Sequence, residues 1–348
     1  MLSDRSATIL KSIVEHYIDR AAPVPSQSIM HSRGLDVSSA TIRNEMMHLE
    51  QEGYIIRPHT SAGSVPSDKG YRFYVETLRD IRLTANQQRM VSHLFHQVET
   101  RLDEWVRLTA AILAHLAQNM ALVATARSTR VLFKHVELVS IQDRTALIVL
   151  VLHGARVRQQ LITFPQTVTQ AELSAAGNRL NQNFAGLTSV QIEATGLPFT
   201  DLERQAVAAL VAIMKSEDTV TLEEPYLEGL QHIFSQPEFA NPQQALTLVD
   251  LLEQKNLMRL ILPHDLSVQG VHVCIGEENE AQPIHNLSVI ISQYGLPGEA
   301  VGCIAVIGPT RMSYLRSIAS VDYLSDVLTR LIARLYGRDV PPETGRYN

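Results

Sequence analysis

The chain of 348 residues lacks the features that mark membrane proteins and disulfide-bonded secreted proteins. It contains no apolar run of about 18 or more residues, which a membrane-spanning helix requires. Its first residues combine Asp4 with Arg5 and include no apolar segment, so we expect no secretory signal. The only two cysteines, Cys274 and Cys303, are too few for a disulfide framework and fit a reducing cytoplasm.

Signatures of catalysis and of metal binding are also missing. The two cysteines stand 29 positions apart, without the Cys-x-x-Cys or histidine spacing that predicts zinc. No glycine-rich phosphate loop follows a predicted strand. Residues 277–280, with three glutamates, favour a solvated turn over a cation site. Residues 308–311 favour a strand-to-helix turn with Arg311 bonded to backbone carbonyls, with an anion site as the alternative. We therefore predict neither an enzyme nor a bound cofactor.

Positive charge is in short supply as well. The formal net charge is −6, which argues against a protein that coats nucleic acid nonspecifically. Residues 1–84 carry ten Lys/Arg and ten Asp/Glu, whereas residues 85–348 carry 20 and 26. DNA binding by the N-terminal part would thus depend on a local basic face and on dimerisation. The small basic group Arg127, Arg130 and Lys134 favours a solvated face over an auxiliary DNA contact.

Three helices are predicted at the start of the chain. The apolar spacing from Ile9 to Ile18 indicates a helix that begins at Ser3 or Asp4 and ends near Arg20. Residues 22–25, which include two prolines, form an extended link. We expect Ser26 to cap a short second helix that ends at Gly34, and Ser38 or Ser39 to cap a third that ends near Glu52.

The third helix has the pattern of a DNA-reading helix. Ile42, Met46 and Leu49 fall within about 60° of each other on a helical wheel and form its buried side. Arg43 has the donors that pair with guanine, and Asn44 has the donor and acceptor that pair with adenine. Thr41 and His48 lie on a flank of the same exposed surface. A solvated helix face is the ordinary alternative.

A hairpin and a fourth helix follow. Residues 54–56 and Val65-Pro66 are predicted as its strands, and Ser67 or Asp68 as the cap of the next helix. Three helices followed by a hairpin are typical of a winged helix-turn-helix, in which the small residues of the hairpin approach phosphates. The candidate contacts in this segment are Arg57, His59, Thr60, Ser61, Lys69 and Arg72. An ordinary surface hairpin is the alternative.

Several long motifs carry a family resemblance. The stretches TIRNEMMHLEQEGYI and PHTSAGSVPSDKGYRFYV, followed by PEF, IGEEN and IGPTRMSY, resemble the HrcA family of heat-inducible transcription repressors over essentially the full chain. One departure concerns the hairpin. The family usually has arginine after SAG, whereas this chain has Ser64, so one expected positive charge is missing.

The resemblance implies an α+β multidomain fold. Its expected parts are a winged helix-turn-helix (1–83), a linker or arm helix (84–122), a GAF-like antiparallel sheet domain (123–154 and 243–337) and an inserted, mainly helical α/β dimerisation domain (155–242). It also implies the function. A homodimer in the cytoplasm would bind double-stranded DNA at an inverted repeat of the CIRCE type and repress chaperone operons. Its activity would depend on the availability of the chaperonin.

The remaining pattern is consistent with these parts. Near-heptad apolar spacing predicts one long helix from Thr84 to Met120. Strands are predicted at 135–141, 145–152 and 156–164, and helices dominate 169–253, with a strand at 188–194. Further strands are predicted at 258–262, 271–276, 287–293 and 301–307, before a last amphipathic helix through Leu335 and a frayed tail from Arg338.

Two other functions stay open. The first is a regulator that responds to a metabolite bound in the GAF-like domain. The second is an enzyme or interaction scaffold in which the winged helix contacts protein. Replacing Arg43 or Asn44 by alanine would leave a scaffold untouched, but would cost a base reader about 1–3 kcal/mol each.

Overall fold

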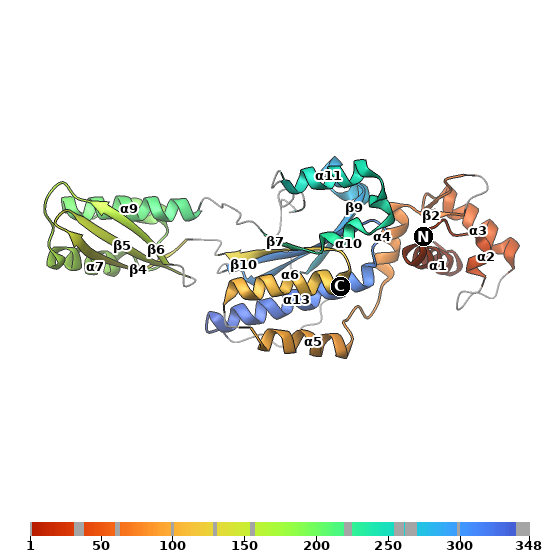
Figure 1. Cartoon of the computed structure of the whole chain (residues 1–348), viewed down its shortest axis with the longest axis horizontal. Coiled ribbons are helices and arrows are strands. Elements are labelled where there is room, and N and C mark those ends of the chain that lie inside the picture. The colour runs from red at the N-terminus through yellow and green to blue at the C-terminus, as the bar shows by residue number, and fades with distance from the viewer. Residues whose placement is uncertain are drawn as a thin grey trace.

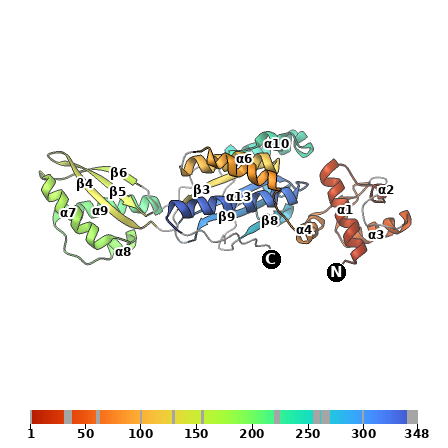
Figure 2. The ribbon, with the colours of Figure 1, turned by 90° about the horizontal axis from the view of Figure 1, so that it is seen from below.

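The computed structural model describes residues 2–30, 38–59, 63–98, 101–127, 131–153, 157–218, 225–253, 261, 270–297 and 300–338. Figure 1 shows three units in a row: an N-terminal unit with α1 to α4, a central unit around a sheet, and a distal unit that carries β4 to β6. The same row is visible from below in Figure 2. The chain is a mixed α/β protein whose sheets are antiparallel throughout the described pairings.

The N-terminal unit consists of α1 (Asp4–Arg20), α2 (Ser26–Ile29), α3 (Ser39–Gln51), β1 (Ile55–Ile56), β2 (Val65–Pro66) and α4 (Asp68–Thr77). Side chains of Ser3, Ser38 and Ser67 cap α1, α3 and α4, each by accepting a hydrogen bond from a backbone N–H three residues on. α2 differs from the prediction, because Ser26 lies inside it and no side chain caps it. Its expected end at Gly34 lies outside the described residues.

The core of this unit confirms the helical wheel. Ile42, Met46 and Leu49 of α3 are buried with Ile9 and Ile13 of α1 in one apolar cluster. The short hairpin pairs Ile55 with Pro66 and Ile56 with Val65. A backbone bridge from Val24 to Ser64 adds a third segment beside β2. The orientation of α3 is therefore set by α1, which lies behind it.

The prediction of one helix from Thr84 to Met120 is wrong. The structure has two helices, α5 (Ala85–His96) and α6 (Leu102–Ala117), and Met120 begins the strand β3 (Met120–Arg127). Both helices bury apolar residues in the same cluster, which explains the continuous spacing in the sequence. Gln118 ends α6 in the left-handed region with φ of 53°, a conformation that its residue type does not announce.

The central unit is a five-stranded sheet in the order β7-β3-β10-β9-β8, built from β7 (Tyr226–Glu228), β8 (Val271–Ile275), β9 (Leu287–Leu296) and β10 (Ala300–Pro309) with β3. On one face, α6 and α13 (Tyr314–Leu335) pack on residues such as Val123, Ile290 and Ile304. On the other face lie α10 (Leu230–Phe234), η1 (Pro237–Ala240) and α11 (Pro242–Glu253). The sheet is thus covered by helices on both faces.

Two short 3-10 helices, η2 (Gly276–Glu278) and η3 (Gln282–Ile284), join β8 to β9. The strands predicted at 271–276, 287–293 and 301–307 and the last helix are confirmed as β8, β9, β10 and α13. The strand predicted at 258–262 lies outside the described residues except for Ile261, which is helical and so contradicts the prediction at that position. The predicted tail lies outside the described residues beyond Arg338.

The distal unit has its own sheet and core. β4 (Phe133–Gln142), β5 (Thr145–Leu152) and β6 (Val157–Thr163) confirm the three predicted strands and pair in that order. The helices α7 (Gln170–Phe184), α8 (Ser189–Glu193) and α9 (Asp201–Asp218) complete the unit, and its buried residues form a separate cluster.

Two expectations about this region require correction. The expected domain of 123–154 and 243–337 includes β4 and β5, but these strands pair with β6 and share a core with α7 and α9, so they belong to the distal unit. The strand expected at 188–194 is the helix α8, because Thr188 forms a capping box with Gln191. The alternation of apolar and polar residues in this segment favours a strand, although the segment is helical.

Candidate nucleic-acid interface

The exposed face of α3 carries the candidate base-reading residues. Arg43, Asn44, Met47 and His48 are all exposed on the side opposite the core. Arg43, Asn44 and His48 have no side-chain hydrogen bond or ion pair within the described part of the chain. Their donors and acceptors are therefore available to an external partner, as reading of base edges requires.

The start of α3 is fixed by local hydrogen bonds. The Ser38 side chain accepts from the Thr41 backbone N–H at 3.2 Å, and the two hydroxyl oxygens lie 3.0 Å apart. Thr41 is therefore half-buried and engaged with the cap, while Arg43 and Asn44 project further along the helix. The sequence predicts all three side chains as DNA contacts, but in the structure Thr41 is engaged with the cap, whereas Arg43 and Asn44 are exposed.

The acidic Glu45 of α3 is turned away from the exposed face. The Ser6 hydroxyl donates to its Oε2 at 2.7 Å, and Arg5 of α1 lies 3.8 Å away. A negative charge in the middle of a DNA-reading helix would repel phosphate. Its contacts with α1 reduce this cost and also tie α3 to α1.

The hairpin residues occupy different environments. Arg57 forms an ion pair with Glu50 at 3.2 Å and is 30% exposed, so its charge is partly offset. His59 is exposed at the end of the described hairpin segment. Thr60 and Ser61 lie outside the described residues. Ile56, at 54% exposure, is an apolar surface residue that the sequence analysis did not select.

Ser64 is not a surface residue. Its side chain is fully buried, and its backbone exchanges two hydrogen bonds with Val24, at 2.8 and 2.9 Å. A Cβ at the neighbouring Gly63 would overlap the backbone of Val24, so only glycine permits this close approach. Position 64, where the resemblance implies an arginine, therefore serves packing in this chain.

Lys69 lies at the base of the hairpin. Its ammonium donates to the Glu52 carbonyl at 2.6 Å and lies 4.3 Å from the centre of the Tyr54 ring. These contacts hold the exposed charge of Lys69 next to the end of α3. This arrangement can place one cation beside a backbone phosphate of a duplex bound at α3.

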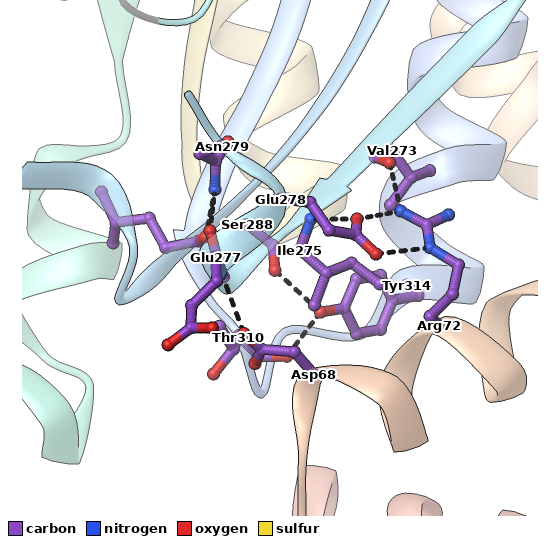
Figure 3. A network of polar contacts seen from close by, with 12 residues as sticks. Asp68, Arg72, Val273, Ile275, Glu277, Glu278, Asn279, Ser288, Thr310 and Tyr314 are labelled. Atoms are coloured by element: carbon purple, nitrogen blue, oxygen red, sulfur yellow. Dashed lines mark hydrogen bonds and ion pairs between the residues drawn. The ribbon is translucent and has the colours of Figure 1, made fainter. Parts of the chain in front are cut away.

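Arg72 points the other way, toward the central unit (Figure 3). Its Nε donates to Glu278 Oε1 at 2.8 Å, a second nitrogen contacts Glu278 Oε2, and the same nitrogen donates to the Val273 carbonyl at 2.6 Å. The hydrogen bond with Glu278 is the main reason that the pKa of Arg72 is raised. In this structure its guanidinium is held within the protein.

Arg311 was assigned to a turn with backbone contacts, and this is confirmed in part. Its Nη1 donates to the Ile18 carbonyl of α1 at 2.9 Å. Its other nitrogens donate to Glu238 and Gln236, at 2.7 and 2.6 Å. The only sequence signal for this arrangement was the GPTR turn.

Of the basic group formed by Arg127, Arg130 and Lys134, Lys134 is exposed, while Arg130 and the Arg127 side chain lie outside the described residues.

Two further features were searched for among the described residues, a metal-binding cluster and a membrane-spanning helix. No group of three or more His, Cys, Asp or Glu side chains with metal-binding geometry occurs there. None of the helices described is both long and apolar enough to cross a membrane.

Comparison with known proteins defines the class. The family model "HrcA protein C terminal domain" matches residues 103–318. A heat-inducible transcription repressor from Dehalococcoides mccartyi is 50% identical over 98% of this chain and 99% of its own length. One from Roseiflexus castenholzii is 39% identical over 97% of this chain and 96% of its own length. These relatives are repressors of transcription.

The chain belongs to the HrcA family. A crystal structure titled a hypothetical protein at 2.2 Å resolution has the same fold, with a TM-score of 0.64 and 21% identity, over 96% of this chain and 99% of that one. That structure extends the likeness to the N-terminal unit, which the family model does not cover.

Proposed function

We propose that this protein represses heat-shock (chaperone) operons by binding an inverted-repeat operator as a homodimer. The observation that carries the proposal is the exposed face of α3, on which Arg43, Asn44 and His48 stand without partners within the described residues. Membership of a family of heat-inducible transcription repressors supports the same reading.

In this proposal the N-terminal unit is a winged helix-turn-helix. α2 and α3 form the helix pair, and the β1–β2 hairpin is the wing. α3 enters the major groove, where the residues near its start reach base edges. Arg43 pairs with a guanine and Asn44 with an adenine, while Thr41 and His48 flank them.

Phosphate contacts then surround α3. Arg57, His59 and Lys69 lie on the hairpin or next to it, and Thr60 and Ser61, which follow His59 in the sequence, are proposed as further contacts. Each such contact adds affinity without sequence preference and makes binding sensitive to salt. To contact phosphate, Arg57 must either leave its ion pair with Glu50 or bind the phosphate while that ion pair persists.

The distal unit is proposed as the dimerisation domain. One face of its sheet packs on α7 and α9, but the other carries apolar side chains that no described residue covers. Val139, Leu147 and Leu161 align in one row across the three strands, and Leu161 is 61% exposed. Burial of this row against a second copy would remove apolar surface from water and place two N-terminal units on one operator.

The central unit is proposed as the GAF-like domain. Chaperonin availability is proposed to set the fraction of active repressor, so that unfolded clients relieve repression by competing for the chaperonin. This part of the proposal rests on the family resemblance.

Titration of an inverted-repeat fragment from upstream of a chaperone operon tests the function. We expect a saturable shift that a scrambled fragment does not give, and a higher active fraction when chaperonin is added. Absence of a specific shift both with and without chaperonin would contradict DNA binding. A shift that is equal in both conditions would contradict only the chaperonin dependence.

A cavity of about 500 Å³ favours a second candidate, a repressor that responds to a metabolite. Phe239, Leu248 and Leu251 form apolar walls, and Asp68 of the N-terminal unit and His285 add polar groups. Binding at 100 times the dissociation constant adds about 2.7 kcal/mol to stability. A metabolite screen by thermal shift that finds no stabilisation would contradict this candidate.

A further inference from the structure

The contact between the N-terminal and central units is made by side chains from well-separated parts of the sequence. We define the junction as Asp68, Tyr71 and Arg72 of α4 together with Glu278, Arg311 and Tyr314 of the central unit. Arg72 and Glu278 are 206 positions apart in the chain. In Figure 3, α4 approaches the turn that follows β8, and the dashed contacts connect the two units.

The ion pair at the junction is built on both sides. Glu278 accepts from Arg72 with both carboxylate oxygens and also from the Ile275 backbone N–H at 2.8 Å. Two-point pairing of a guanidinium with a carboxylate fixes orientation as well as distance. The turn itself is held by Asn279, which is buried and donates to the Gly276 and Leu287 carbonyls at 2.8 and 2.9 Å.

A second polar contact lies beside this pair. Asp68 accepts from the Glu277 backbone N–H at 3.0 Å. Gly276, with φ of +54°, allows this approach, because a Cβ at that position would overlap the Asp68 carboxylate. Two residues of α4, four positions apart, are thus attached to one turn of the central unit.

Apolar packing supports the polar contacts. The rings of Tyr71 and Tyr314 lie 5.7 Å apart, and both residues belong to one buried cluster shared by the two units. The Tyr314 hydroxyl lies 2.8 Å from Ser288 Oγ and donates to the Thr310 carbonyl at 2.6 Å. Hydrogen bonds on the central side therefore hold the Tyr314 ring against which α4 packs.

A third attachment involves the end of α1. Arg311 is 11% exposed at its side chain and donates to the Ile18 carbonyl, while Glu238 and Gln236 hold its other nitrogens. α1 in turn carries the core residues behind α3 and the Ser6 contact to Glu45. Fixing α1 and α4 to the central unit therefore fixes the direction of α3.

From this geometry we propose that the junction is a specificity determinant: it sets the spacing between operator half-sites that the dimer accepts. This inference rests on the proposed function. A freely jointed head would accept many spacings, whereas a head fixed at three points presents the two α3 helices at one separation. Because half-sites rotate around the duplex by one turn in about 10.5 base pairs, a fixed pair of heads tolerates little change in spacing. In this role Arg72 is a positioning residue and does not contact phosphate.

The test compares inverted-repeat fragments from upstream of a chaperone operon whose central spacer is lengthened in steps up to about half a helical turn. The full-length protein is expected to lose tenfold or more in affinity over this series. Arg72→Ala and Glu278→Ala should each reduce that loss to about threefold or less, and the double variant should behave like either single one. Affinity for a single half-site should not change, because α3 is untouched.

A phosphate contact predicts a different pattern. Arg72→Ala would then weaken binding equally at every spacing and reduce the salt slope by about one, and Glu278→Ala would leave the spacing profile unchanged. That pattern would overturn the inference while leaving the proposed function intact. Failure of the unaltered protein to bind any inverted repeat would instead contradict the proposed function itself.

A charge-reversed pair provides a second readout in case a single variant damages the head. If half-site binding also falls in a single variant, the double variant Arg72→Glu with Glu278→Arg distinguishes loss of the junction from damage to the head. Recovery of the spacing preference in the reversed pair, relative to Arg72→Glu alone, supports the junction. No recovery contradicts it.

Discussion

Arg43 and Arg72 are both arginines of the N-terminal unit, yet their surroundings differ. Arg43 is exposed and has no partner within the described residues. Arg72 is held by Glu278 and the Val273 carbonyl. An arginine already paired with a carboxylate must lose that interaction before it binds phosphate, whereas a free one need not. Burial and pairing therefore separate two residues that the sequence grouped as DNA contacts.

Alanine at Arg43 or Asn44 is expected to weaken operator binding by about 1–3 kcal/mol and to relax the preference at one base pair. Binding to fragments with each base pair replaced in turn measures both effects. Gln51→Ala, at the exposed far end of α3, is the matched control and should bind normally. Uniform weakening on all fragments would argue that the side chain contacts phosphate only.

Asp322 of α13 gives a prediction about pH. Burial and the neighbouring Asp326 raise the pKa of Asp322 to about 6, above the unfolded value of about 3.9. Ionisation therefore costs the folded state nothing below about pH 4, and the cost grows as the pH rises and is complete above about pH 6. Because this carboxyl is partly solvated and water screens its charge, we expect its ionisation to destabilise the folded state by about 1 kcal/mol.

Asp322→Asn should accordingly raise the Tm by about 1–2 °C near pH 7.5 and leave it unchanged near pH 4. Differential scanning calorimetry of both proteins at the two pH values measures the difference. The same change at the exposed Asp143 is the control. An equal gain at both pH values would show that the effect does not come from ionisation.

At the scale of elements, the sequence predicted periodicity well and boundaries less well. Capping serines and the buried stripe of α3 were predicted because both depend on residues within one or two turns. The division between α5 and α6 was missed, since two helices on one core repeat apolar residues as one long helix does. The helix at α8 was missed because five residues are too few to establish a period.

Gly70 of α4 tests how closely elements pack in the N-terminal unit. A Cβ there would overlap the Tyr54 carbonyl, so Gly70→Ala should destabilise the unit although alanine favours helix by about 1 kcal/mol. Hydrogen exchange of α1 and α3 amides should rise, while that of α7 and α9 stays constant. Gly196→Ala, with no atom within 4 Å of the new Cβ, is the control. Slower exchange in α1 would contradict the clash.

At the scale of the whole molecule, the three units in a row place the N-terminal and distal units at opposite ends of the central sheet (Figure 1). The proposed dimer contact and the proposed DNA contact are therefore far apart. Any influence of one on the other passes through the central unit and its junction with α4. In the proposed repressor, the geometry of the junction therefore affects operator recognition.

Leu161→Lys in the exposed row of the distal sheet is expected to raise the dimer dissociation constant by more than about tenfold, because each copy would place a charge against apolar surface. Light scattering with size-exclusion chromatography over a dilution series measures it. Val190→Lys, on α8 of the same unit and 68% exposed, is the control. Unchanged dimerisation in Leu161→Lys would place the contact elsewhere.

Local periodicity, capping and contiguous motifs were enough to predict the exposed face of α3, most strands of the central and distal sheets, and membership of the family. Tertiary packing was needed to show that β4 and β5 share a separate core with α7 and α9, that Ser64 is buried, and that Arg72 meets Glu278. The physical reason is distance along the chain. A pairing across 206 positions is selected by the packing of whole units, and no local pattern of residues records it.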